Sequence, residues 1–149
     1  MWQLTQYKMQ IQNKKFRFRQ FPVYGDARIF VRNLKTLIRK KFPHTEQFSL
    51  TAQMFRALDS IILNIAEGSD RMTDKDFAHF LNMSHTSLNE VVACCDIALD
   101  SKYFTAQEHN DCLKCAEILA NQLTAFRKSL LKSPIKWLKN PRQRSIVKC

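Results

Sequence analysis

The sequence has little of the two residue types that most often interrupt helices. Its 149 residues include only two glycines and four prolines, so long uninterrupted helices are expected. The two glycines, Gly25 and Gly68, leave no room for a glycine-rich phosphate-binding loop. No apolar run approaches the roughly 18 residues that a membrane-spanning helix needs, and the first ten residues lack the features of a signal peptide. These absences predict a cytoplasmic protein without a membrane partner.

Acidic residues are scarce at both ends of the chain. Residues 1–41 carry 11 Lys and Arg against the single acid Asp26, a net charge of +10. Residues 42–126 carry 5 against 12, a net charge of −7, and residues 127–149 carry 8 against none. The total of +11 is therefore concentrated at the two ends, and such an asymmetry indicates a polyanionic partner.

Cysteines are present, but their pattern favours packing. Five is an odd count, and without an export signal reduced thiols are the default. Cys94–Cys95 and Cys112–Cys115 flank a turn nearly symmetrically, so a zinc site or a disulfide there is an alternative. The preferred interpretation is that they pack, because Cys95 and Cys112 fall on apolar seams and buried cysteine acts as a small hydrophobe. We expect no metal and no cofactor.

The apolar periodicity predicts an all-α protein, an antiparallel up-down-up-down four-helix bundle. The helices are expected to begin near Ala27, between Thr45 and Ser49, at Thr73 and at Thr105. The last two carry seams with 4-3 spacing, typical of bundle packing: Phe77, Leu81, Ser84, Leu88, Val91, Cys95 and Ala98, then Cys112, Ala116, Leu119, Leu123, Phe126 and Leu130. The predicted organisation is an N-terminal arm (1–25), the bundle (26–131) and a basic flexible tail (132–149).

Local signals place the helix ends. Asp26 is expected to cap the first helix, and Gly68 to end the second in the left-handed conformation. Thr105 and Glu108 form a capping box for the fourth helix. The segment "KKFRFRQF" alternates cations with phenylalanines, which favours an extended arm or a short strand. Its aromatics are expected either to stack on unpaired bases or, as we prefer for at least two of them, to pack on the end of the bundle.

A basic stripe follows one side of the first predicted helix. Arg28, Arg32 and Arg39 share it with Lys35, and no acid lies nearby in sequence to pair with them. The stripe is either simply solvated or a phosphate-contacting surface, and we favour the second interpretation. The candidate nucleic-acid-binding residues are Lys14, Lys15, Arg17, Arg19, Arg28, Arg32, Lys35, Arg39, Lys40, Lys41, Arg127, Lys128, Lys132, Lys136, Arg142 and Arg144.

A polar stripe on the second predicted helix lies roughly opposite its apolar stripe. A solvent-exposed helix face usually carries many Lys and Glu residues, whereas this stripe has Ser, Asn and Gln, and a leucine flanks it. A wet face, a subunit contact and a catalytic row are the three interpretations. We favour the subunit contact, made by Gln53, Arg56, Ser60, Leu63, Asn64 and Glu67.

The stretch from Phe42 to Glu90 resembles a known family, the four-helix bundle proteins encoded in 23S rRNA intervening sequences, often labelled S23 ribosomal proteins. The resemblance is carried by Phe42–Pro43, Glu46, Phe48, Leu50, Gln53, Arg56–Ala57, Asn64–Gly68, Phe80–Leu81, Ser87–Leu88 and Glu90. Phe55 departs from the family pattern, where an arginine is common, and Thr86 replaces the usual glycine.

The resemblance implies a closed homo-oligomer, a pentamer in the family, and the family has no established enzymatic activity. The family is similar in design to the accessory bundle protein of diversity-generating retroelements, which works with a reverse transcriptase and RNA. We therefore expect a non-catalytic homopentamer that binds structured RNA, DNA or a ribonucleoprotein partner, or alternatively an accessory scaffold for a reverse transcriptase. A remote alternative is a HEPN-like ribonuclease, since Arg39 and His44 have an R-x4-H spacing.

Overall fold

The computed structural model describes residues 15–132. Within that range it is built from four α-helices: α2 (Pro22–Lys41), α3 (Leu50–Ser69), α4 (Asp74–Asp100) and α5 (Ala106–Lys132). Two short 3-10 helices, η1 (Arg17–Gln20) and η2 (His44–Glu46), precede α2 and α3. The described part of the chain contains no strand, and the predicted all-α fold is confirmed.

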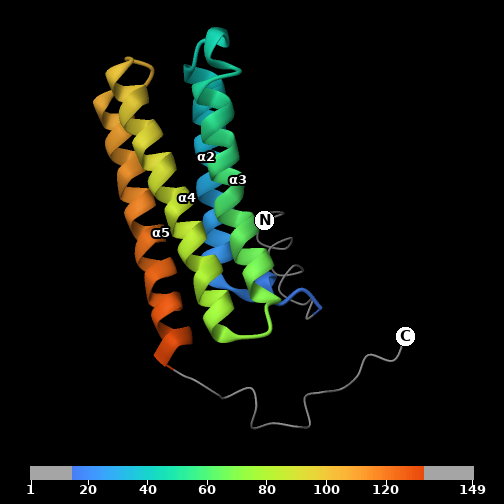
Figure 1. Cartoon of the computed structure of the whole chain (residues 1–149). Helices are drawn as coiled ribbons and strands as arrows, with labels where there is room; N and C mark the ends of the chain where they lie inside the picture. The colour runs from blue at the N-terminus through green and yellow to red at the C-terminus, as the bar shows by residue number, and fades with distance from the viewer. Residues whose placement is uncertain (1–14, 133–149) are drawn as a thin grey trace, which may run out of the picture.

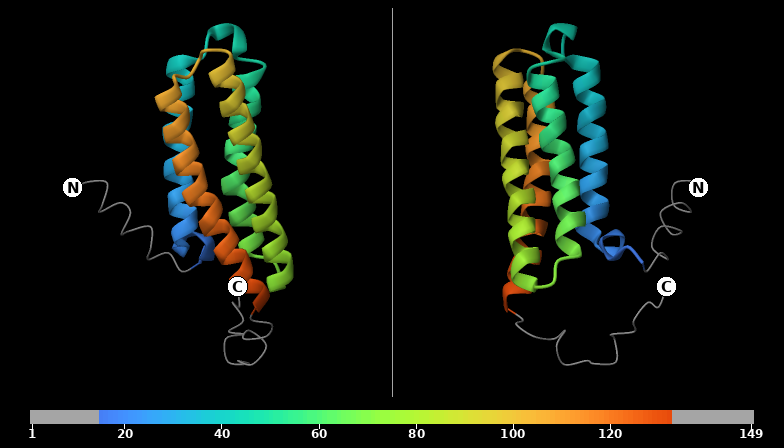
Figure 2. Two further views of the ribbon diagram at one scale, coloured as in Figure 1. Left: turned by 90° about the vertical axis from the view of Figure 1, so that its left-hand side faces the viewer. Right: turned by 45° about the vertical axis from the view of Figure 1, so that its right-hand side comes forward.

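Successive helices run in opposite directions and form a four-helix bundle (Figure 1). The start of α2 and the end of α5 lie at the same end, which we call the lower end (Figure 2). The α3–α4 and α4–α5 pairs pack closely, whereas α2 packs more sparsely against its neighbours. The core is made of buried residues from all four helices, among them Ile38, Met54, Ile61, Leu88 and Leu119.

The predicted seams of α4 and α5 are largely confirmed. All seven α4 seam residues are buried, as are Ala116, Leu119 and Leu123 of α5. The helix starts at Thr73 and Thr105 are also correct. The Thr73 hydroxyl accepts from the Asp76 amide at 3.0 Å. In the capping box, the Thr105 amide donates to Glu108 at 2.9 Å and the Glu108 amide to Thr105 at 3.2 Å.

The predicted start of the first helix, near Ala27, is wrong. α2 begins at Pro22, with Phe21 as its N-cap, because proline at the first helical position has its φ already set. Asp26 therefore lies inside the helix, where it accepts a hydrogen bond from Gln122 Nε2 of α5 at 2.8 Å. The extended arm is also corrected over residues 17–20, which form η1.

Gly68 does not end its helix in a left-handed conformation. It lies within α3, and no described glycine has a positive φ. A Cβ at this position would lie 2.5 Å from Phe80 Cβ and 2.8 Å from Phe77 Cδ2. Glycine allows this close approach of α3 and α4, since a side chain here would force the neighbouring atoms to shift.

Candidate nucleic-acid interface

The basic stripe of α2 lies on the surface of the bundle. Arg28, Arg32 and Arg39 are exposed, because the apolar stripe of the same helix turns them away from the core. Two of them rest against rings: the Arg39 guanidinium lies 5.1 Å from the ring centre of Phe55, and that of Arg28 lies 5.9 Å from that of Tyr24. Such cation–π contacts hold the guanidinium groups against the surface of the bundle.

Lys35 and Lys41, both predicted phosphate contacts, form ion pairs within the chain. Lys35 forms an ion pair with Asp59 of α3 and also lies over the Phe55 ring. Lys41 forms an ion pair with Glu108 of α5 at 2.7 Å. The prediction that no acid lies a helical turn away from the stripe holds for Lys35, but Asp59 of the neighbouring helix pairs with it. Phe55, the departure from the family pattern, supplies the ring beneath Lys35 and Arg39.

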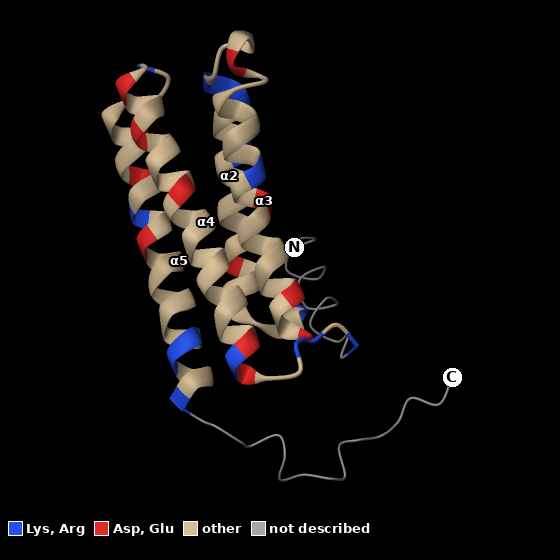
Figure 3. Cartoon of the chain, viewed as in Figure 1, with Lys and Arg blue, Asp and Glu red and all other residues tan. Residues whose placement is uncertain are grey.

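The lower end of the bundle gathers a second group of cations. Figure 3 shows Lys and Arg at the end of α5 and along the segment that precedes α2. Lys15, Arg17, Lys128 and Lys132 are exposed. Arg127 donates to Asn82 of α4. The remaining predicted contacts, Lys14, Lys136, Arg142 and Arg144, lie outside the described residues.

Aromatic packing fixes the segment before α2 at this end. The Phe21 ring stacks on Phe77 with 5.8 Å between centres and meets Phe126 edge-on at 5.0 Å. Phe18 meets Tyr24 edge-on at 4.9 Å. The Arg17 guanidinium lies 5.6 Å from the centre of Phe21. The prediction that at least two of these phenylalanines pack on the bundle end is confirmed.

Part of the polar stripe of α3 lies against α4. The Ser60 hydroxyl lies 2.8 Å from that of Ser87, and Asn64 Nδ2 donates to the Ser60 carbonyl oxygen at 2.8 Å. Gln53 donates to Glu90. Asn64 is only 8% exposed, so its expected place on an outer, subunit-contacting surface is corrected. The reason is that a helix in a bundle packs against two neighbours, and its buried arc is therefore wider than its apolar stripe.

The outer part of the same stripe stays on the surface. Arg56 is exposed and donates to Gln53, and Glu67 is exposed and forms an ion pair with Arg71. Leu63 is 63% exposed. A subunit contact made by these residues stays a prediction.

The four cysteines within residues 15–132 differ in their surroundings. Cys94 and Cys95 are buried in the core, Cys112 is half-buried and Cys115 is exposed. Residues 15–132 hold no group of three or more metal-ligating side chains. The thiols of Cys95 and Cys112 share a hydrogen bond. This hydrogen bond and burial raise the pKa of Cys95, whereas the same hydrogen bond lowers the pKa of Cys112. Cys94, Cys95 and Cys112 thus pack in or against the core, whereas Cys115 lies at the surface.

A groove runs between α2 and α5, where the bundle packs least tightly. It encloses about 360 Å³ and is lined mainly by apolar side chains, including Ile29, Leu37 and Ile118. Ile29 and Ile118 are exposed in the described chain. Apolar side chains grouped in this way are typical of a contact surface.

The upper end of the bundle is closed by a polar network around two glutamates. The Tyr103 hydroxyl donates to Glu46 at 2.9 Å. Hydrogen bonds from Ser49, Tyr103 and the Leu50 amide lower the pKa of Glu46. The hydrogen bond from Lys41 and the Thr105 amide lower the pKa of Glu108 to about 2. Both carboxylates serve the structure at this end.

His44 and Arg39, the pair with ribonuclease-like spacing, occupy different elements. His44 is exposed in η2, and Arg39 lies in α2 over the Phe55 ring. Asp70 and Arg71 are not among the predicted site residues. They line a charged pocket with the segment before α2, and only the folded chain brings these two segments together.

These features define a class: a basic four-helix bundle with its cations on α2 and at one end. The chain belongs to the family of 23S rRNA-intervening sequence proteins, whose model matches residues 19–125. Among curated proteins no sequence matches the chain. Within the described residues, no helix is both long and apolar enough to cross a bilayer.

A solved structure shows the same fold. It is a protein of unknown function from the S23 ribosomal protein family of Bacteroides thetaiotaomicron VPI-5482, and it is similar to this chain with a TM-score of 0.50 and 22% sequence identity. The match covers 74% of this chain and 95% of that chain. At this level of identity, the likeness bears on the fold alone.

Proposed function

We propose that this protein is a non-catalytic nucleic-acid-binding bundle whose ligand is structured RNA. The observation that carries the proposal is the exposed basic stripe of α2, where Arg28, Arg32 and Arg39 stand in a row on one helix face. Rows of this kind attract phosphates because binding releases the counterions condensed on the nucleic acid. The cations at the lower end of the bundle lie near the beginning of α2, and they continue the positive surface of the stripe there.

We propose in addition that copies of the chain associate into a closed ring, with the pentamer as the expected size. The exposed apolar side chains beside the α2–α5 groove support this proposal. Association would multiply the positive charge, since each chain carries a formal charge of +11. A ring would therefore bind one RNA at several points.

Charge-matched variants test the RNA proposal. The double variant Arg32→Gln/Arg39→Gln removes two charges from the stripe, and Lys102→Gln/Lys114→Gln removes two exposed charges from α4–α5. Binding of a labelled RNA hairpin is followed by fluorescence anisotropy at several salt concentrations. The stripe variant is expected to make the negative slope of log K against log salt shallower by about 1.5. The control variant is expected to keep the slope of the unaltered protein.

Other outcomes contradict the proposal. Equal slopes for the two variants would remove the stripe from the interface. If the stripe variant binds RNA as well as the unaltered protein does, and a reverse transcriptase co-purifies stably with the chain, the accessory-scaffold alternative would be favoured. RNA cleavage that His44→Ala abolishes would make the protein a ribonuclease.

A further inference from the structure

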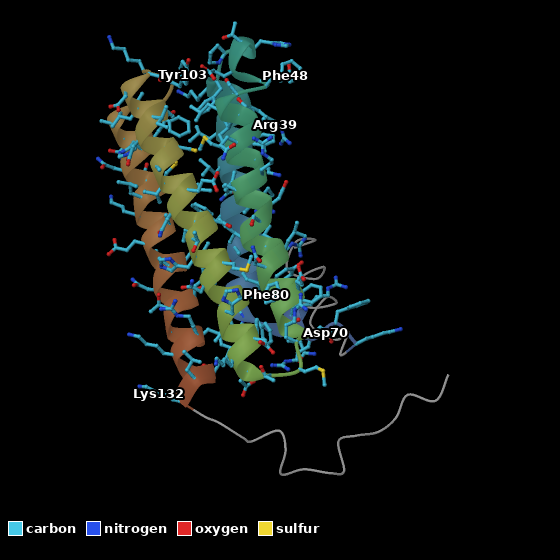
Figure 4. The ribbon with its side chains drawn as sticks, in the orientation of Figure 1. Arg39, Phe48, Asp70, Phe80, Tyr103 and Lys132 are labelled. Atoms are coloured by element: carbon cyan, nitrogen blue, oxygen red, sulfur yellow. The ribbon has the colours of Figure 1, made fainter. Side chains whose placement is uncertain are left out.

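A charged pocket lies at the lower end of the bundle, apart from the α2 stripe. It encloses about 370 Å³ and is formed by two segments far apart in sequence, 15–18 and 66–71. Figure 4 shows Asp70 at this end, beyond Phe80. The lining residues are Lys15, Phe16, Arg17, Phe18, Ala66, Ser69, Asp70 and Arg71. A volume of this size is at the small end of ligand pockets.

The pocket combines three kinds of chemistry. Its cations outnumber its one acid by three to one. Phe16 is 48% exposed and lies 6.1 Å, centre to centre, from the ring of Phe18. Asp70 is exposed, and its carboxylate makes no hydrogen bond or ion pair with residues 15–132. A nucleotide that carries adenine, cytosine or guanine matches these three groups: cations for the phosphate, a ring for the base face and an acceptor for the exocyclic amino group.

The pocket walls are held in place before any ligand arrives. Arg71 forms an ion pair with Glu67, and its guanidinium lies 4.3 Å from the centre of the Phe80 ring. The Arg19 amide donates to the Phe16 carbonyl oxygen at 3.1 Å, and Phe18 is fixed by Tyr24. A wall that is already ordered loses less entropy when it binds.

We infer that this pocket binds one unstacked nucleotide of a single-stranded nucleic acid. The base stacks on Phe16, Lys15 and Arg71 contact the adjacent phosphates, and Asp70 accepts from an exocyclic amino group. The inference rests on the proposed function, since it assigns to this pocket the unpaired part of the RNA. An exposed aromatic ring favours a nucleic acid over an acidic peptide, because it offers a stacking surface that a peptide carboxylate does not use.

The test compares two short oligonucleotides of equal length, one of cytidine ribonucleotides and one abasic, together with a DNA version of the first. Binding to the full chain is measured by fluorescence anisotropy. Phe16→Ala is expected to weaken cytidine binding about 5- to 150-fold, the loss of one stacked base, and to leave abasic binding unchanged. The matched control is Phe48→Ala, which removes an 88% exposed ring at the upper end.

The outcomes separate this inference from the proposed function. Equal cytidine binding by Phe16→Ala and Phe48→Ala, while the RNA hairpin still binds, would overturn the pocket and leave the proposed function standing. No binding of any nucleic acid at low salt would overturn both. A preference for an acidic peptide that Phe16→Ala leaves intact would overturn the pocket's assignment to nucleotides. Equal binding of the RNA and DNA oligonucleotides would support the pocket and assign recognition to base and phosphate instead of the 2′-hydroxyl.

Discussion

Gly68 is the position where a single methyl group should most clearly disturb this bundle. In Gly68→Ala the new Cβ meets Phe80 Cβ at 2.5 Å and Phe77 Cδ2 at 2.8 Å. Neither atom can easily move away: Phe80 Cβ is attached to the α4 backbone, and Phe77 is fully buried between Phe21 and Phe126. The helices must therefore separate locally.

The magnitude follows from two opposing effects. Overpacking of a tight contact costs about 1–3 kcal/mol, and the rigid neighbours place this site near the upper value. Alanine gains about 1 kcal/mol over glycine in helix propensity. We expect the free energy of unfolding to fall by about 2 kcal/mol, which for a chain of this size lowers Tm by about 6 °C.

Urea and thermal denaturation followed by circular dichroism measure this change. Ala93→Gly, at an exposed position of α4, calibrates the propensity effect and should cost about 1 kcal/mol. A Gly68→Ala protein that is as stable as the unaltered chain, or more stable, would refute the close approach of α3 and α4.

Two further predictions concern the upper end and the groove. Because the pKa of Glu108 is lowered from 4.5 to about 2 in the folded protein, its contribution to stability is present above pH 4.5 and is lost as the pH falls toward 2. Glu108→Gln should therefore be less stable at pH 6, with a gap that narrows below pH 4.5 in urea denaturation; a gap independent of pH would contradict this. Ile118→Lys, at a 60% exposed position beside the groove, should lower the mass measured by light scattering, whereas Asn89→Lys on α4 should not; equal masses would exclude the groove as the contact.

Patterns that depend on one helix at a time were predictable from the sequence. The seam of α4 and the Thr105–Glu108 capping box depend on residues three or four apart, and such spacings determine local contacts. The elements that differ depend on neighbours distant in sequence. The alternation around Phe18 predicted an extended arm, but the bundle end offers rings on which the phenylalanines pack.

The candidate site was only partly predictable for the same reason. A helical wheel identifies the exposed row of Arg28, Arg32 and Arg39, but it cannot show that Asp59 of α3 reaches Lys35. It also assigns Asn64 to the surface, since it records the apolar stripe and not the second neighbour of α3. The pocket at the lower end joins segments about 50 residues apart, and no local pattern announces it.

The salt dependence of RNA binding tests the central claim most directly. For the unaltered chain and a structured RNA, log K against log salt should fall with a slope of about −3 or steeper, as expected for four or more phosphate contacts. A slope near zero, or no binding at about 50 mM salt where such electrostatic binding is strong, would contradict the account.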